Sequence, residues 1–261
     1  MSTETIVEKT SSYFISQCQD RYEQIAAAHP DSLRPAITIS HLTGAGVGEI
    51  AGRLARRLEQ TEFKAKHPWA VFDQQLIETA LEEHRWPKEL AEKITEEKRL
   101  FIDELMDDLF GLRPPSWVLV PQVVETTLRL AMAGQAILVG HGATVVTANL
   151  PNVFHVRLTG SLTRRIERVQ KLQNLTREAA AKFVSKEDRK RARYLKAHFR
   201  ARLDNELLYD LVINTDRLSD DAAAALIAEG TWKLFSTLKR PALIQPTVSE
   251  SWMPLSPDCL I

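Results

Sequence analysis

Cysteine is scarce in this sequence: the 261 residues contain only two, Cys18 and Cys259, near opposite ends of the chain. They form no pair motif, which argues against a zinc site and a disulfide framework and indicates a reducing compartment. Net charge is missing too, because 34 basic residues balance 34 acidic ones. No global field therefore draws the chain toward nucleic acid or a membrane surface, and such a role would need a local patch.

Long apolar stretches are also absent. No run approaches the roughly 18 residues that span a bilayer, so we expect no membrane segment. The first residues, MSTETIVEKTSS, carry acidic side chains and lack the apolar core of a secretory signal. We therefore expect a cytoplasmic protein. An apolar content of 44% and a charged content of 26% are those of an ordinary globular chain that buries a sizeable core.

Short apolar segments alternate with helical patterns through the middle of the chain. The strand candidates are 36–40, 69–73, 135–143, 152–158 and 209–215. The helix candidates are 50–60, 74–84, 88–113, 120–134 with Gly134 as its C-cap, 161–172, 176–202 and 218–235 with Ser219 as its N-cap. This order predicts an α/β fold with a parallel sheet of about five strands and helices on both faces. Such sheets bind ligands at the carboxyl ends of their strands.

The two ends of the chain differ from this middle part. Residues 5–28 have the spacing of an amphipathic helix, and HPDSLRP (29–35) ends it with two prolines. The last residues, 239–261, contain four prolines and little periodicity. We expect an N-terminal helical extension (1–35), one α/β domain (36–238) and a C-terminal arm (239–261), with either end a candidate contact in a homodimer.

A glycine-rich loop, HLTGAGVGEI (41–50), follows the first strand candidate and opens a helix. Glycines let backbone N–H groups wrap closely around an anion, and the helix dipole adds positive potential there. The usual phosphate loop also supplies a lysine to the phosphates and a Ser or Thr hydroxyl to magnesium. Here the lysine place is taken by Val47, and Glu49 follows Gly48. Three glycines alone are a weak signal, and a plain tight turn is an equal interpretation.

A strongly basic segment lies between Lys182 and Arg202. It carries nine Lys or Arg residues against two acids, Glu187 and Asp188. One interpretation is a solvated helix face. Another is a lid whose arginines close over polyphosphate, because the planar guanidinium binds phosphate oxygens in pairs. Nucleic-acid binding is disfavoured, because few aromatic residues, Tyr194 and Phe199 among them, are interleaved with these charges.

Taken together, these segments resemble the cytidylate kinase-like family of P-loop nucleoside monophosphate kinases over roughly residues 36–235. The resemblance is carried by ITISHLTGAGVGEIA (37–51), VFDQQLIETA (71–80), AILVGHGATVV (136–146), NVFHVRLTGSLTRRIERV (152–169), EDRKRARYLKAHFRARLDN (187–205) and YDLVINTDRLS (209–219). Their order and spacing are more specific than any single motif. The resemblance implies a P-loop kinase fold with a helical lid at about 182–205, and ATP with Mg²⁺ as cofactors.

The resemblance also implies roles for particular residues. The donor phosphates are expected on the loop backbone of Gly44, Ala45, Gly46, Val47, Gly48 and Glu49, with Arg165 and Arg168 reaching phosphate. Glu49 is a metal-ligand candidate. The acceptor nucleotide is expected at Asp73 and at the turn Gly140, His141 and Gly142. The catalytic lid arginines are expected to be Arg189, Arg191 and Arg200. Each position also has a plain structural interpretation, for example Asp73 as a helix cap.

Three cationic positions common among such kinases are weakened here. Val47 replaces the loop lysine, although this group often lacks it. His141 stands where a glycine-arginine-glycine turn offers arginine to the acceptor phosphate, and Gln74 stands where lysine is common. Each lost contact of this kind costs on the order of 10² in rate or more.

Three functional hypotheses follow, of which nucleic-acid binding through the basic helix is the least favoured. The first is an ATP-dependent kinase of a nucleoside monophosphate, CMP or dCMP by resemblance. The second is a nucleotide-binding sensor that has lost the chemistry and acts through a protein partner.

Overall fold

The computed structural model describes residues 34–60, 68–73, 116–140 and 142–238. The expected helices 5–28, 74–84 and 88–113, the arm 239–261, and both Gln74 and His141 lie outside these described residues.

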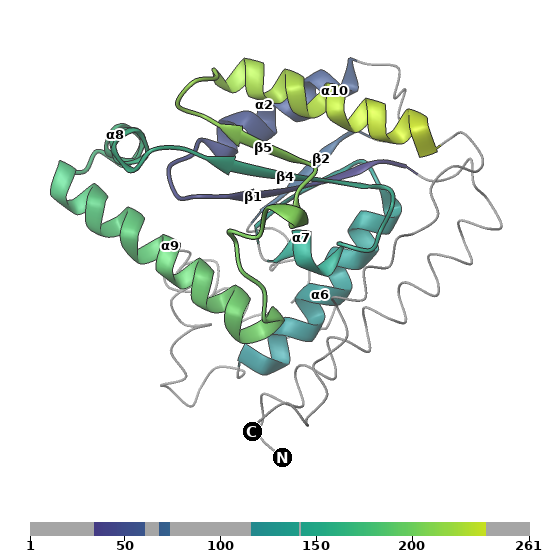
Figure 1. Cartoon of the computed structure of the whole chain (residues 1–261), viewed down its shortest axis with the longest axis horizontal. Coiled ribbons are helices and arrows are strands. Elements are labelled where there is room, and N and C mark those ends of the chain that lie inside the picture. The colour runs from purple at the N-terminus through teal and green to yellow at the C-terminus, as the bar shows by residue number, and fades with distance from the viewer. Residues whose placement is uncertain (1–33, 61–67, 74–115, 141, 239–261) are drawn as a thin grey trace.

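Five parallel strands form one sheet in the order β2-β3-β1-β4-β5 (Figure 1). The strands are β1 (Ala36–His41), β2 (Ala70–Phe72), β3 (Ala136–Val139), β4 (Val153–Thr159) and β5 (Leu211–Asn214). The sequence prediction of a five-stranded parallel sheet is therefore confirmed. Because β1 lies between β3 and β4, its carboxyl end borders the carboxyl ends of both neighbours.

Helices cover both faces of the sheet, as predicted (Figure 1). The described helices are α2 (Val47–Glu59), α6 (Ser116–Ala133), α7 (Ala143–Val146), α8 (Leu162–Gln173), α9 (Arg177–Phe199), the short 3₁₀ helix η2 (Glu206–Leu208) and α10 (Asp220–Leu238). Helices α2 and α10 lie side by side over one face, and α6 and α7 pack on the other. The long α9 packs along α8 and ends against the α6 and α7 side.

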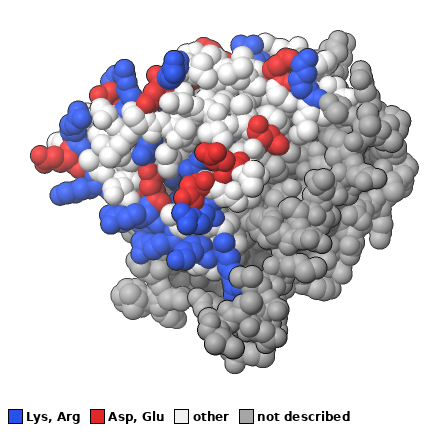
Figure 2. Space-filling view, in the orientation of Figure 1, with Lys and Arg blue, Asp and Glu red and all other residues white. Residues whose placement is uncertain are grey.

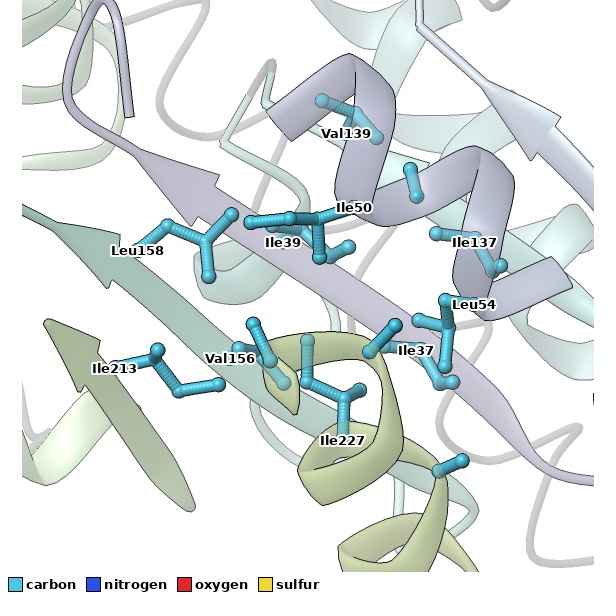
Figure 3. Close-up of a cluster of buried hydrophobic side chains, with 14 of the residues drawn as sticks. Ile37, Ile39, Ile50, Leu54, Ile137, Val139, Val156, Leu158, Ile213 and Ile227 are labelled. Carbon is cyan, nitrogen blue, oxygen red and sulfur yellow. The ribbon is translucent and has the colours of Figure 1, made fainter. Parts of the chain in front are cut away.

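The core of the first face is an apolar cluster. Ile50, Leu54 and Leu58 recur every four residues along α2 and are fully buried, so one stripe of the helix faces the sheet. They meet Ile37 and Ile39 of β1, together with side chains from β4 and α10 (Figure 3). Burying each such side chain contributes about 1.5–3 kcal/mol. This packing fixes the start of α2 against the carboxyl end of β1.

The second face mixes apolar packing with a buried polar group. Leu128 of α6 and Leu138 of β3 belong to its core. Thr38 of β1 is opposite His155 of β4, and its Oγ1 lies 2.8 Å from His155 Nδ1 and 3.1 Å from Thr144 Oγ1 of α7. Burial lowers the pKa of His155 to about 4, so the imidazole is neutral at ordinary pH.

Helix boundaries follow from local capping groups. Gly134, at φ 73°, donates its N–H to Leu130 O, so it ends α6 as predicted. Ser219 Oγ accepts from the N–H of Ala222 and so caps α10, also as predicted. Ser161 and Thr176 cap α8 and α9 in the same way. Within the described part of the chain, no helix combines the length and apolarity needed to cross a lipid bilayer.

Candidate nucleotide site

The glycine loop lies between β1 and α2 and packs directly on helix α8. Gly44 and Gly46 have φ of 82° and 83°, which L side chains rarely adopt. A Cβ on Gly44 would lie 2.5 Å from the carbonyl oxygen of Arg165, and one on Gly46 would lie 1.5 Å from Arg168 Nη1. A Cβ on Gly48 would meet nothing within 4 Å. Gly44 and Gly46 are thus favoured by their backbone conformation and by close packing, independently of any ligand.

The loop nevertheless leaves a row of backbone donors without acceptors. Ala45 donates to Leu42 O, and Ile50 donates to Gly46 O. The N–H groups of Gly46, Val47, Gly48 and Glu49 donate to no acceptor within the described residues. Consecutive unpaired amides at the start of a 13-residue helix form a favourable place for a phosphate.

The side chains at the start of α2 do not include the lysine that a usual phosphate loop offers to the phosphates. Val47 is half-buried and packs against the apolar core of the first face. Glu49 is exposed in the first turn of α2 and raises the pKa of Arg53 together with Asp221 and Asp220, of which Asp221 has the largest effect. No group of three or more His, Cys, Asp or Glu side chains suited to a metal occurs in the part of the chain described.

Thr43, the first residue of TGAGVG, is the centre of a polar network that joins the loop to α8 and α9. Its N–H donates to Asp188 Oδ1 at 2.8 Å, and its carbonyl accepts from Arg165 Nη1 at 3.0 Å. Its hydroxyl accepts from Arg191 Nη1 at 3.0 Å. Asp188 also pairs with Arg165 at 2.6 Å and with Arg191 at 3.5 Å. Helix α9 is therefore fastened to the loop through one buried charge, Arg165, and two half-buried charges, Asp188 and Arg191.

Of the three predicted lid arginines, the structure brings Arg191 to the loop. Desolvation lowers its pKa, while Asp188, Glu187 and Asp73 raise it. Arg189 is exposed and donates to Ser185 O of its own helix. Arg200 ends α9 at φ 49° and lines a pocket of about 390 Å³ beyond the helix. The catalytic roles assigned to these three residues remain predictions.

Periodicity distinguishes these arginines. Ala180, Val184, Asp188, Arg191 and Leu195 recur every three or four residues, and all are buried or half-buried. They form the inward stripe of α9. Arg189 lies off this stripe. The sequence therefore contained the signal that separates Arg191 from Arg189.

The two arginines expected at phosphate both have protein partners. Arg165 is buried, and its Nε donates to Gly160 O while Nη1 reaches Thr43 and Asp188. Arg168 pairs with Asp220 of α10 at 2.8 Å beside Gly46. Both therefore buttress the loop from α8, and their contact with phosphate remains a prediction.

The predicted acceptor residues surround the carboxyl end of β1. The N–H of Gly140, after β3, donates to Ile39 O at 3.1 Å. Gly142 packs so closely on Phe199 of α9 that a Cβ would lie 2.6 Å from the ring. Asp73 follows β2, and desolvation raises its pKa while Arg191 opposes the shift. The structure thus brings Gly142 against Phe199 and Asp73 near Arg191, both on α9, while Gly140 is bonded to β1.

Sequence reasoning missed Arg157, Ser40 and Tyr209. Ser40 is opposite Arg157 in the β1–β4 register, and Arg157 Nη1 lies 3.5 Å from Ser40 Oγ and 3.2 Å from the Tyr209 hydroxyl. The guanidinium also lies over the Tyr209 ring, 5.5 Å from its centroid. Arg157 is the one charged residue in the expected strand 152–158, and a charge inside a buried strand was the available signal.

Comparison with known proteins agrees with this geometry. The model of the cytidylate kinase-like family matches residues 36–217, which is well over half of the chain. The chain belongs to the cytidylate kinase-like family. The matched residues include the glycine loop, β3 with its turn, and helix α9. No curated protein sequence gives a significant match.

Solved structures similar to this cytidylate kinase-like chain extend over most of its length. The first is an uncharacterized protein from Eubacterium ventriosum that is 15% identical, with a TM-score of 0.55. The match covers 77% of this chain and 99% of that chain. A second, TT1252 from Thermus thermophilus, is 18% identical, with a TM-score of 0.42 and coverage of 76% and 96%. At these identities, the first comparison supports the fold alone.

The basic segment of this family member is divided between its interior and its surface. Figure 2 shows Lys and Arg side chains gathered along one side of the molecule, where α9 runs in Figure 1, beside a smaller acidic group. Lys190 is buried and pairs with Glu187 at 3.2 Å. The solvated-face interpretation therefore describes Arg189 and Arg193, whereas Lys190 and Arg191 belong to the packed side of α9.

Proposed function

We propose that this chain binds ATP at the glycine loop and transfers a phosphoryl group to a nucleoside monophosphate, with CMP or dCMP as the acceptor. Family membership supports a nucleotide kinase-like role. The observation that carries the proposal is the row of unpaired amides at residues 46–49, in a loop whose Thr43 hydroxyl binds Arg191. Unpaired donors at a helix start, next to a partly buried guanidinium, fit a polyphosphate.

Phosphoryl transfer needs positioning and charge stabilisation more than a reactive side chain. The loop amides would hold the donor phosphates, and Arg191 would stabilise charge on the migrating group. When bound, Mg²⁺ would neutralise the charge that develops on the phosphates. Glu49 is the single carboxylate at the start of α2, and a cation held mainly by phosphates and water needs no more than one or two.

Steady-state conversion of CMP to CDP by purified protein with ATP and Mg²⁺ tests the kinase proposal. The expected result is turnover that saturates in both substrates and is lost without Mg²⁺. Absence of turnover across a panel of nucleoside monophosphates at high enzyme concentration would overturn it. The cytoplasmic location, the domain boundaries at 36 and 238 and a homodimer through either end remain proposals, and sedimentation of the full chain tests the last.

Specific observations favour a sensor as the second candidate. Val47 turns into the core, and Arg165 and Arg191 are already engaged by Asp188 and Thr43. Thermal unfolding with nucleotides separates the two candidates, because a ligand that binds only the folded state raises the apparent stability. Stabilisation by ATP without any turnover supports the sensor. If ATP neither stabilises the protein nor is turned over, both candidates are excluded.

A further inference from the structure

Arg157 carries a charge that the described protein does not neutralise. Arg157 is half-buried, and its guanidinium contacts the Ser40 and Tyr209 hydroxyls and the Tyr209 ring. No carboxylate of the described residues pairs with it. Asp204 is exposed, and both of its carboxylate oxygens accept from Arg202. Its pKa is lowered mainly by the hydrogen bond from Arg202, and Arg157 makes the smallest contribution to that shift. A partly desolvated charge without a counter-ion is unfavourable, and an anionic ligand relieves it.

Arg157 is also close to a second cation. Arg191 donates to His41 O and to Thr43 Oγ1, while Arg157 lies at Ser40, the residue just before His41. The positive charge of Arg157 contributes to lowering the pKa of Arg191. Two guanidinium groups at the same strand end repel each other until an anion joins them.

Arg157 lies within side-chain reach of the turn after β3. Gly140 is bonded to Ile39 on one side of β1, and Arg157 is opposite Ser40 on the other side. Neighbouring strands lie about 4.8 Å apart, so the two positions are separated by roughly two strand spacings. An extended arginine side chain spans most of that distance. The turn itself reads Gly140-His141-Gly142, without an arginine.

We propose that Arg157, acting with Arg191, binds the phosphate of the acceptor nucleoside monophosphate in place of the arginine that the turn after β3 lacks. This inference rests on the proposed function. Ser40 and the Tyr209 hydroxyl lie 3.3 Å apart, and the Tyr209 hydroxyl is 3.2 Å from Leu203 O. Because these two groups keep partners without Arg157, the guanidinium is free to turn toward a phosphate and is not required for the fold.

Replacing Arg157 by methionine in the full chain tests this. Arg157→Met keeps an unbranched stem and removes the charge. The dissociation constant for CMP, measured by titration calorimetry, should rise about 10-fold or more, because charge-assisted hydrogen bonds to phosphate are lost. Binding of cytidine, which has no phosphate, and of an ATP analogue should be unchanged. The melting temperature without ligand should stay the same or rise. Arg157→Lys should retain part of the CMP affinity, because the charge remains without the planar fork.

Arg129→Met is the matched control, since Arg129 is an exposed arginine of α6 paired with Glu125, and it should not alter CMP binding. Unchanged CMP affinity in Arg157→Met overturns the inference and leaves the proposed function standing. Equal loss of CMP and ATP binding with a lower melting temperature assigns Arg157 a structural role and also overturns it. Wild-type protein that binds neither nucleotide overturns the inference together with the proposed function.

Discussion

At the scale of single residues, the three glycines of the loop are not equivalent, and alanine substitution should separate them. Gly44→Ala should cost about 3 kcal/mol of unfolding free energy, because its new Cβ meets backbone at a positive φ. Gly46→Ala should cost about 2 kcal/mol, since Arg168 is able to move aside. Gly48→Ala, the control, should leave stability unchanged or raise it by about 0.5 kcal/mol. Urea unfolding measures all three, and a loss with Gly48→Ala as large as that with Gly44→Ala would contradict this order.

A second residue-scale prediction concerns His155. Its pKa in the folded protein, about 4, is lower than the ordinary value of 6.5, so the unfolded chain takes up a proton first as the pH falls. The stability linked to this group is therefore complete above pH 6.5 and is lost between pH 6.5 and about 4, in total on the order of 3 kcal/mol. His155→Gln should be less stable at pH 7 but should lose less stability over that range. Denaturant unfolding at several pH values gives the comparison, and parallel pH profiles would contradict it.

Val47 offers a residue-scale test of the missing lysine. Val47→Lys should raise the rate of phosphoryl transfer by on the order of 10²-fold if charge at this position limits the reaction. It should also lower stability by about 1 kcal/mol, because Val47 packs against the core. The rate of CDP formation and the urea midpoint measure the two effects. An unchanged rate would indicate that the phosphates do not approach this position.

At the scale of elements, the contact between α9 and the loop depends on one half-buried carboxylate, that of Asp188. Asp188→Asn should destabilise the protein by about 3 kcal/mol, because Arg165 keeps its charge and loses its partner. Hydrogen exchange should speed up along α9 and at the Thr43 amide. Asp204→Asn, the same substitution in an exposed pair with Arg202, should change neither. Equal effects of the two variants would show that Asp188 does not hold α9 against the loop.

The elements also show what could be predicted from the sequence. Strands and helices were found because each buries a repeating apolar face, as Ile50, Leu54 and Leu58 do in α2. The network at Thr43 could not be found, because it joins residues as far as 148 positions apart. Arg157 and Ser40 meet only through the register of β1 and β4. The order of the strands therefore decides which charged residues share the site, and local sequence patterns do not reveal that order.

At the scale of the whole molecule, the end of the sheet opposite the site depends on Asn152. Its Nδ2 donates to Arg34 O and to Ala131 O at 2.9 Å each, joining the entry to β1, the end of α6 and the start of β4. Asn152→Ala should lower the unfolding free energy by about 2–3 kcal/mol, because two carbonyls lose their donor. CMP binding at the far end should persist. Asn205→Ala, which removes the single cap of η2, is the control and should cost about 1 kcal/mol or less.

The central place of β1 has a consequence for how the chain is made. β1 is the first strand among the described residues, yet Thr38 of β1 contacts His155 of β4, 117 positions later. During synthesis at about 5–20 residues per second, the apolar segment AITIS leaves the ribosome roughly 5–25 s before its β4 neighbour exists. Until β3 and then β4 have been made, the nascent chain exposes a strand that lacks its sheet neighbours and is prone to aggregate, and its yield in cells should depend on chaperones that bind such segments.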